Sequence, residues 1–547
     1  MRARSYLVFL SCGFTLTVAA ASCGPGDHCS VTQTCPTNNE GGGGAGGTSD
    51  AGGGVSDGGG GALPGELGFP CGAPSECDSG FCVDGVCCAG ACDGTCEACD
   101  GSGTCAPHAP GTDPDGDCAD GVCDGVGVCA TGAHRWSKRF GDGGGDELTG
   151  LDARSSRIGF VGRYEGSPEF GLGPLSAPTN AHGAFGVQLD LSGVATLSLS
   201  VVDAFISVVD GAVGPDGRLL ISGGGGNGEA DFGGGTLSLG LGSGDGFLGA
   251  VSVNGSHVHS DTIGGYGASI TRVVATASEE AVVVGRVDDS GGNLGGVTIG
   301  SGIGLFVAKL DSTGNGLWSF NEVVGSVFAE ALAIQDDGDI VVVGSASGDV
   351  MFGSKVLPGS GPRLFLLRLS AAGDVLSAHA WGSATTQLLA VTSVDDDIVL
   401  GGAFSSAIDF GGPTLTAVSG DDVFVARVTE DGQHVWSARY GEGGDQSVAS
   451  LGVAADGALY AAGLYNGTLS FGVGGTSSGG GFVVKIHPSG EPIWSRDLAG
   501  GVSSVHLAGL DDGGVVVGGS FTGNVDLGGG VLTSAGETDV FAAAFDP

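Results

Sequence analysis

Cysteine is the residue type in this sequence with the most obvious chemistry. All 16 cysteines lie between Cys12 and Cys129, and none follows. Twelve fall within residues 69–130, namely Cys71, Cys77, Cys82, Cys87, Cys88, Cys92, Cys96, Cys99, Cys105, Cys118, Cys123 and Cys129. A segment this small with few large apolar residues needs covalent cross-links. We therefore predict a disulfide-rich module with up to six disulfides, whose pairing the spacing does not give.

Zinc is the alternative chemistry for these thiols. Cys96-Glu-Ala-Cys99 has the two-residue spacing of a zinc-binding pair. The adjacent Cys87 and Cys88 are awkward for one metal, and cysteine-rich zinc sites are typical of reducing compartments. We expect disulfides here, and no metal site.

The N-terminus has the pattern of an export signal. Arg2 and Arg4 precede the uncharged, mostly apolar stretch 6–21, which is too short for a comfortable membrane span. The next residues, Ala20-Ala21-Ser22-Cys23, resemble a bacterial lipobox, in which the cysteine becomes the lipidated first residue. The resemblance implies a signal peptide over residues 1–22 and a lipid anchor on Cys23, which would be the protein's only attachment to a membrane.

Ala20 departs from the leucine that the lipobox pattern prefers. Ordinary cleavage after Ala21, which would leave Cys23 to pair with another cysteine, is therefore the alternative. Either reading predicts an exported protein, at the outer membrane or cell surface if lipid-anchored and otherwise secreted.

Residues 23–68 are predicted to be a flexible tether. The stretch 40–63 is almost entirely Gly, Ala, Ser, Thr and Asp. Such a segment buries too little apolar surface to offset its chain entropy. Its reach from Cys23 to Cys71 is about 40 Å by the flexible-linker relation.

Charge and glycine content restrict the classes of partner and fold. The chain has 19 Lys and Arg against 61 Asp and Glu, a formal charge of −42. A surface this acidic repels phosphate backbones and anionic head groups, so we exclude nucleic acid as a partner. The 115 glycines occur without a triplet period, which favours a turn-rich, all-β structure.

Residues 134–547 repeat with a period of about 59 residues. Three columns each occur seven times. They are a serine column at Ser137, Ser198, Ser260, Ser319, Ser377, Ser437 and Ser495; a glycine column at Gly162, Gly223, Gly285, Gly344, Gly401, Gly463 and Gly518; and a phenylalanine column at Phe185, Phe247, Phe306, Phe365, Phe424, Phe482 and Phe541. The phenylalanines are spaced by 62, 59, 59, 59, 58 and 59 residues.

Each repeat contains aliphatic runs separated by Asp-Gly and Ser-Gly turns, as in 331–334, 339–343, 364–369 and 375–379. This pattern predicts four short strands. Seven such units fit a seven-bladed β-propeller; an open β-solenoid is the alternative, but its repeats are usually shorter. The region opens with a lone outer strand, 135–140, and stops after a third strand, so we expect the N-terminal strand to complete the last blade and remove an open sheet edge.

Two stretches resemble known families. Asp409-Phe-Gly-Gly, Asp422-Val-Phe-Val-Ala-Arg-Val, Asp431-Gly and Val435-Trp-Ser resemble the SBBP β-propeller repeat of bacterial surface proteins. Residues 77–99 resemble a cysteine-rich prefix of bacterial surface lipoproteins. The resemblances imply an exported propeller on a secreted spacer and carry no catalytic residues to transfer.

Several other motifs suggest metal chemistry. His257-Val-His259 puts two imidazoles on one side of a strand, and Asp113-Pro-Asp115-Gly-Asp117 resembles half of a calcium loop. The loop lacks the glutamate that closes an EF-hand, and no third histidine lies near. The aspartate runs at 336–337, 395–397 and 511–512 share the phase of hairpin turns, where aspartate side chains accept hydrogen bonds from the local backbone. We expect exposed edge histidines, solvated acidic turns and no cofactor, with calcium as the weaker alternative.

The sequence leaves two classes of function. The first is a surface binding or scaffold protein whose propeller engages a protein or glycan, without catalysis. The second is a propeller enzyme, such as a lyase or quinoprotein-type oxidoreductase, with a site in the central channel. The candidate innermost strands, such as 448–454 and 332–334, are small and apolar. This favours binding, because propeller enzymes need polar groups from several blades at one point.

Overall fold

The structure is a computed structural model of the 547-residue chain. It describes residues 64–547, except 117, 119–120, 126, 179–181, 202–204, 227, 241–244, 265–266, 288–289, 301–303, 322, 383–385, 455 and 474–478. The predicted signal peptide, the lipidation at Cys23 and the tether up to residue 63 lie outside the described residues. Among those described, no helix has the length and apolar character needed to cross a membrane.

The disulfide-rich module contains very little regular structure. Its elements are one 3-10 helix, Pro74–Glu76, and three two-stranded sheets, which pair β1 (Cys82–Val83) with β2 (Val86–Cys87), β3 (Glu97–Cys99) with β4 (Cys105–Pro107), and β5 (Val122–Cys123) with β6 (Cys129–Ala130). The buried cluster at its C-terminal end is built from cysteine side chains. Cross-links therefore replace the apolar core that a segment of this size cannot build.

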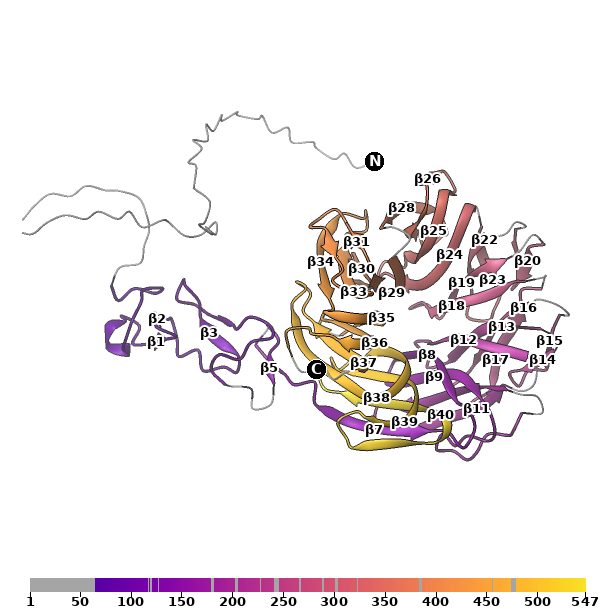
Figure 1. Cartoon of the computed structure of the whole chain (residues 1–547), viewed down its shortest axis with the longest axis horizontal. Helices are drawn as coiled ribbons and strands as arrows, with labels where there is room; N and C mark the ends of the chain where they lie inside the picture. Colours follow the sequence, from indigo (N-terminus) through magenta and orange to yellow (C-terminus); the bar gives the residue numbers. More distant parts are fainter. Residues whose placement is uncertain are drawn as a thin grey trace, which may run out of the picture. The chain divides into compact units, whose positions relative to one another are not determined.

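The repeat region is an all-β β-propeller whose sheets surround a centre (Figure 1). Four sheets have four antiparallel strands each: β8 (Glu147–Arg154), β9 (Arg157–Tyr164), β10 (Gly183–Asp190) and β11 (Ala195–Val201); β12 (Phe205–Val213), β13 (Leu219–Gly226), β16 (Asp245–Val251) and β17 (His257–Thr262); β18 (Ser269–Ala275), β19 (Ala281–Val287), β22 (Gly304–Leu310) and β23 (Gly316–Phe320); β29 (Thr386–Val394), β30 (Asp397–Phe404), β33 (Asp422–Val428) and β34 (His434–Tyr440).

The remaining large sheets are variations on the same meander. One contains β24 (Val323–Ile334), β25 (Ile340–Phe352), β27 (Pro362–Leu369) and β28 (Val375–Trp381), with β26 (Lys355–Leu357) paired to β25. The other runs β35 (Gly443–Val453), β36 (Leu459–Thr468), β37 (Gly479–Ile486), β38 (Pro492–Gly509), β39 (Val515–Asp526), β40 (Val531–Phe545) and β7 (His134–Phe140). Three side hairpins pair β14 (Gly228–Asp231) with β15 (Thr236–Leu239), β20 (Gly292–Leu294) with β21 (Val297–Ile299), and β31 (Ala407–Ile408) with β32 (Leu415–Thr416).

The seven-stranded sheet consists of two four-stranded halves that share β38. The first part of β38 pairs with β37 up to Ala499, and the rest pairs with β39. At the far edge β40 pairs with β7, which places Phe541 opposite Arg139. Strands about 400 residues apart in sequence are therefore neighbours in one sheet.

The glycine and phenylalanine columns recur together because their residues pack against each other. In each repeat a buried phenylalanine lies opposite a glycine on the neighbouring strand, as Phe185 lies opposite Gly162. A Cβ on Gly162 would lie 2.5 Å from that ring, so only glycine fits. The glycines opposite Phe424 and Phe541 are Gly402 and Gly519, one residue beyond the predicted Gly401 and Gly518.

A β-bulge interrupts each innermost strand at the same place in the repeat. The bulges lie between residues 148/150, 208/210, 270/272, 329/331, 388/390, 448/450 and 502/504. A bulge bends its strand and re-aims the side chains that follow it. These strands are β8, β12, β18, β24, β29, β35 and the second half of β38, and the first six lie toward the centre in Figure 1.

Candidate functional site in the central channel

A cavity of about 440 Å³ is enclosed by the innermost strands. Each of the seven strands contributes to its wall, including residues 151–154 of β8, 272–275 of β18, 331–334 of β24 and 506–509 of β38. The aliphatic residues of β24 and β35 agree with the expectation of small apolar walls. The expectation is wrong for β8, β12, β18 and β38, which bring charged or titratable side chains to the cavity.

Asp152, Asp210, Arg272 and His506 line the channel. Each comes from a different innermost strand, respectively β8, β12, β18 and β38. Glu330 of β24 stands at the bulge beside this wall. Sequence reasoning missed all five. Position in the repeat is the one feature that could have pointed to two of them. Asp210 and Arg272 each directly follow a β-bulge and occupy equivalent places in consecutive repeats.

Asp152 and Asp210 each accept a hydrogen bond from a backbone amide of the next sheet. Val213 N–H donates to Asp152 Oδ2 at 2.7 Å, and Val273 N–H donates to Asp210 Oδ2 at 2.9 Å. Asp152 Oδ1 also accepts Ala153 N–H at 2.8 Å. A hydroxyl makes a similar link between the two halves of the seven-stranded sheet, since Leu507 N–H of β38 donates to Ser450 Oγ of β35 at 3.1 Å. These side chains therefore join adjacent sheets around the channel.

Burial away from bulk water is the main cause of the pKa shifts of the acidic and histidine side chains at the channel. Burial raises the pKa of Asp210 to about 6, although the Arg272 guanidinium and two backbone amides oppose the rise. Burial also raises the pKa of Asp152 and, against the pull of Arg272, that of Glu330. Burial, reinforced by the positive charge of Arg272, lowers the pKa of His506 to about 4, so its imidazole is neutral at pH 7.

Arg272 is the charge shared by these groups, because its field acts on Asp210, Glu330 and His506. One of its guanidinium nitrogens donates to Thr271 O at 2.7 Å. The arrangement offers a cation, a neutral imidazole and carboxylates from separate strands within one cavity. Such a set can hydrogen-bond a polar ligand and, in principle, transfer a proton to or from it.

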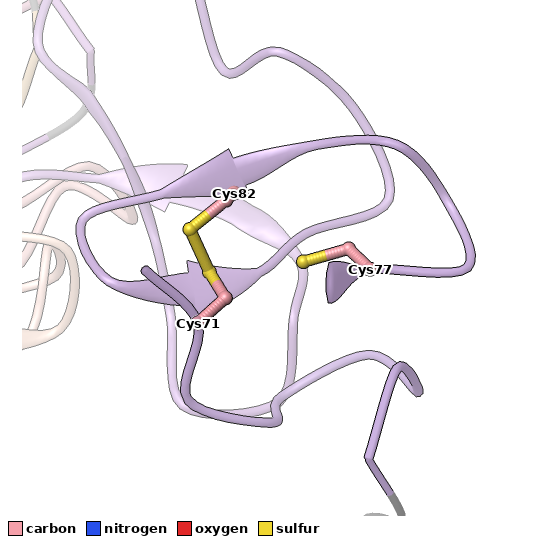
Figure 2. A group of neighbouring side chains, drawn as sticks. All are labelled: Cys71, Cys77 and Cys82. Atoms are coloured by element: carbon pink, nitrogen blue, oxygen red, sulfur yellow. A yellow bond between two sulfur atoms is a disulfide. The ribbon is translucent and has the colours of Figure 1, made fainter. Parts of the chain in front are cut away.

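The structure joins all twelve cysteines of the module into six disulfides: Cys71–Cys82, Cys77–Cys87, Cys88–Cys99, Cys92–Cys105, Cys96–Cys123 and Cys118–Cys129. Figure 2 shows Cys71 bonded to Cys82 with Cys77 beside them. Cys96 and Cys99, the possible zinc pair, bond to different partners. The disulfide-rich character predicted for the module is confirmed, and it indicates an oxidising, extracytoplasmic environment.

The two histidines of β17 do not form a common site. His257 Nε2 lies 3.0 Å from Ser260 Oγ. His259 is 8 % exposed and packs against Gly314 in the next sheet, so the predicted exposed edge position is wrong for it. The cause is packing, because the outer-strand side chain at this phase covers a turn of the following sheet.

The acidic turns are exposed to solvent, as expected, and some of their aspartates also contact an arginine. Arg368 contacts Asp337 and Asp339, and Arg427 contacts Asp395 and Asp397. In the module, Asp115 Oδ2 lies 2.7 Å from His108 Nε2, so this member of the half calcium loop has a protein partner. Asp117 lies outside the described residues.

Comparisons with known proteins give fold-level likeness only. No family model matches the chain, and no curated protein matches it. Among solved structures, the RRP9 WD40 repeats align at 9 % identity and TM-score 0.42, covering 75 % of this chain and 97 % of that one. A protein of unknown function from Dyadobacter fermentans DSM 18053 aligns at 12 % identity and TM-score 0.39, covering 76 % and 98 %. The Pyrococcus horikoshii acylaminoacyl peptidase aligns at 11 % identity and TM-score 0.35, covering 68 % and 49 %.

Proposed function

We propose that this chain is an exported binding or scaffold protein that presents a seven-bladed β-propeller to a protein or glycan ligand. Its lipid anchor is Cys23, which places it at the outer membrane or cell surface. The lipobox-like sequence before Cys23, the resemblance to SBBP repeats and the six disulfides support an extracytoplasmic, surface-attached protein.

A repeated contact supports the blade number. An outer-strand side chain lies against a turn glycine of the following unit at Trp136–Gly193, Leu197–Gly255, His259–Gly314, Trp318–Gly373, His379–Gly432, Trp436–Gly490 and Trp494–Gly132. The last of these glycines lies two residues before β7, and its N–H donates to Pro547 O at 3.3 Å. In the other units this turn is formed by one continuous stretch of chain. Here the two ends of the repeat region form it together, as expected if β7 closes the ring.

Hydrogen exchange tests the closure. Peptides covering residues 134–140 should show slow exchange at the amides that pair with residues 540–545, because this part of β40 protects them. Fast exchange of 134–140 within an otherwise protected propeller would contradict both the closure and the count of seven.

The observation that carries the binding proposal is the convergence of Asp152, Asp210, Arg272 and His506 on one cavity, while both carboxylates hold backbone amides of the next sheet. Both carboxylates therefore link neighbouring strands, and the cavity stays polar. A pre-formed cavity with a few convergent polar groups is typical of a ligand site.

The test is a binding screen of the whole chain on glycan arrays and in surface pull-downs. Arg272→Ala should abolish capture of the ligand found, because it removes the cation of the channel. Arg286→Ala is the matched control, since Arg286 lies exposed on the adjacent strand β19. Equal capture by both variants would exclude the channel as the binding site.

A propeller enzyme is the second candidate, favoured by one observation. His506 and Glu330 have pKa values shifted in opposite directions and both lie within the field of Arg272. Pairs of titratable groups with divergent pKa values are typical of acid–base sites. Turnover in a panel of lyase, hydrolase and quinone-dependent dehydrogenase assays, abolished by His506→Ala, would reverse the ranking.

A further inference from the structure

Two fully buried carboxylates meet away from the channel, where β7 leads into β8. Asp146 stands just before β8 and Asp539 lies in β40, and both have 0 % exposure. Both flank Gly141. A Cβ on Gly141 would lie within 2.6 Å of Asp146 Oδ2 and of Asp539 Oδ1, so the two carboxylates converge on the side where this glycine lacks a side chain. The φ of +128° at Gly141 also requires glycine.

The hydrogen bonds of this pair leave one oxygen of each carboxylate without a partner. Asp539 Oδ2 accepts Arg139 N–H and Ala535 N–H, both at 2.7 Å, and Asp146 Oδ2 accepts Asp142 N–H at 3.0 Å. Asp146 Oδ1 and Asp539 Oδ1 are buried and accept no hydrogen bond. An unpaired buried acceptor is rare in native proteins and needs a partner such as an ordered water or an ion.

The charges around Asp146 and Asp539 also indicate a missing cation. Arg139 balances one of the two buried carboxylates. The charge of Asp142 also acts on Asp146, and Asp142 is itself held by the amides of Gly144 and Ser167. Burial, and then the charges of Asp142 and Asp539, raise the pKa of Asp146 to about 7. One negative charge at this place lacks a counter-charge, and burying an uncompensated charge is expensive.

The chain contains a second copy of this arrangement with one charge fewer. There Gly441, Asp422, Gln446 and Arg439 occupy the places of Gly141, Asp539, Asp146 and Arg139. A Cβ on Gly441 would lie within 2.7 Å of Asp422 Oδ1 and Gln446 Oε1, and both oxygens are buried without a partner. Because glutamine is neutral, Arg439 balances Asp422 and no charge remains.

We propose that Asp146 and Asp539 form a binding site for one hard divalent cation, which each carboxylate coordinates through one oxygen and water completes. Oxygen donors of this kind suit Ca²⁺ and Mg²⁺. An extracytoplasmic protein meets both ions free in solution. The copy at Asp422 and Gln446 keeps the geometry but lacks the charge, and it binds no cation.

The site is tested by equilibrium dialysis of the whole chain after a chelator has removed bound metal. The chain is dialysed against CaCl₂ or MgCl₂. The buffer contains 0.15 M NaCl, which screens the charges of the acidic surface. The wild type should bind one ion per chain with a dissociation constant of about 10⁻⁴ to 10⁻³ M, the range of extracellular calcium modules. Asp146→Asn, which recreates the neutral copy, should lose this ion. The exposed Asp336→Asn is the matched control and should keep it.

Gln446→Asp provides a gain-of-function test that does not depend on the folding of Asp146→Asn. It gives the second copy the same two carboxylates and should raise the stoichiometry from one ion to two. In the wild type, the cation should also raise the thermal midpoint by about 1 to 3 °C at ten times its dissociation constant. Three outcomes would overturn the proposal: no bound ion in the wild type, an unchanged stoichiometry in Asp146→Asn, or no second ion in Gln446→Asp. A shared proton would then be the counter-charge.

Discussion

The indole of Trp436 covers the turn of the following sheet at Gly490. Its Nε1–H donates to Pro488 O at 2.9 Å, and a Cβ on Gly490 would lie 2.9 Å from the indole ring. Gly490 has a φ of +102°. The contact joins two sheets through one side chain and one backbone turn, and equivalent contacts recur along the repeat.

Gly490→Ala should destabilise the propeller by about 2 to 4 kcal/mol. The new methyl group clashes with the Trp436 ring and also forces alanine into a left-handed backbone conformation. Denaturant unfolding measures the loss. Gly472→Ala is the control, because Gly472 has a φ of +79° but nothing within 4 Å of its added Cβ. Equal losses in the two variants would show that the indole contact contributes nothing.

Two substitutions at Asp210 should separate its hydrogen bond from its charge. Asp210→Ala removes the acceptor of Val273 N–H and should cost about 1 to 3 kcal/mol at every pH. Asp210→Asn keeps an acceptor oxygen and should change only the pH dependence of the free energy of unfolding. The folded-state pKa of about 6 lies above the usual value of 3.8, so wild-type stability should fall as pH rises from about 4 to about 6. Unfolding curves of Asp210→Asn that keep this slope would contradict the assignment.

His506 should make the fold sensitive to acid. Its pKa of about 4 lies below the ordinary 6.5, so its contribution to stability is complete above pH 6.5 and is lost as pH falls toward 4. His506→Gln should remove this part of the acid sensitivity. The measurement is the thermal midpoint between pH 4 and pH 7, with His487→Gln as a control because His487 lies in a turn and does not line the channel. Parallel curves for wild type and His506→Gln would contradict the prediction.

Reduction should affect the module and spare the propeller. All six disulfides lie between Cys71 and Cys129, and each typically contributes about 2 to 5 kcal/mol to a small exported domain. With a phosphine reductant, limited proteolysis should cut within 69–130 and leave 134–547 intact. Cleavage distributed over the repeats would show that the propeller depends on the module for its stability.

Cys23→Ser tests the anchor. If Cys23 carries the lipid, the wild type should partition with detergent and incorporate labelled palmitate, whereas Cys23→Ser should do neither and appear in the soluble extracellular fraction. Incorporation of label by Cys23→Ser would place the lipid elsewhere.

The sequence predicts the repeat well because its columns reflect local packing. The phenylalanines repeat because each needs a facing glycine. The strands expected over 331–334, 364–369 and 375–379 fall within β24, β27 and β28, and the one expected over 339–343 begins one residue before β25. The channel residues could not be found in this way. Asp210 and Arg272 share one position but differ in chemistry, so no column of like residues marks them. The pair Asp146 and Asp539 is separated by almost the whole repeat region, and only the three-dimensional arrangement brings it together.

The pairing of β7 with β40 has a consequence for biogenesis. β7 leaves the ribosome first among the propeller strands, and its partner follows some 400 residues later. Until then β7 offers an unsatisfied row of amides and carbonyls, which invites pairing with a foreign chain. Contacts this distant in sequence also slow folding. Export in an unfolded form therefore suits this molecule, because synthesis is then complete before either strand has to find the other.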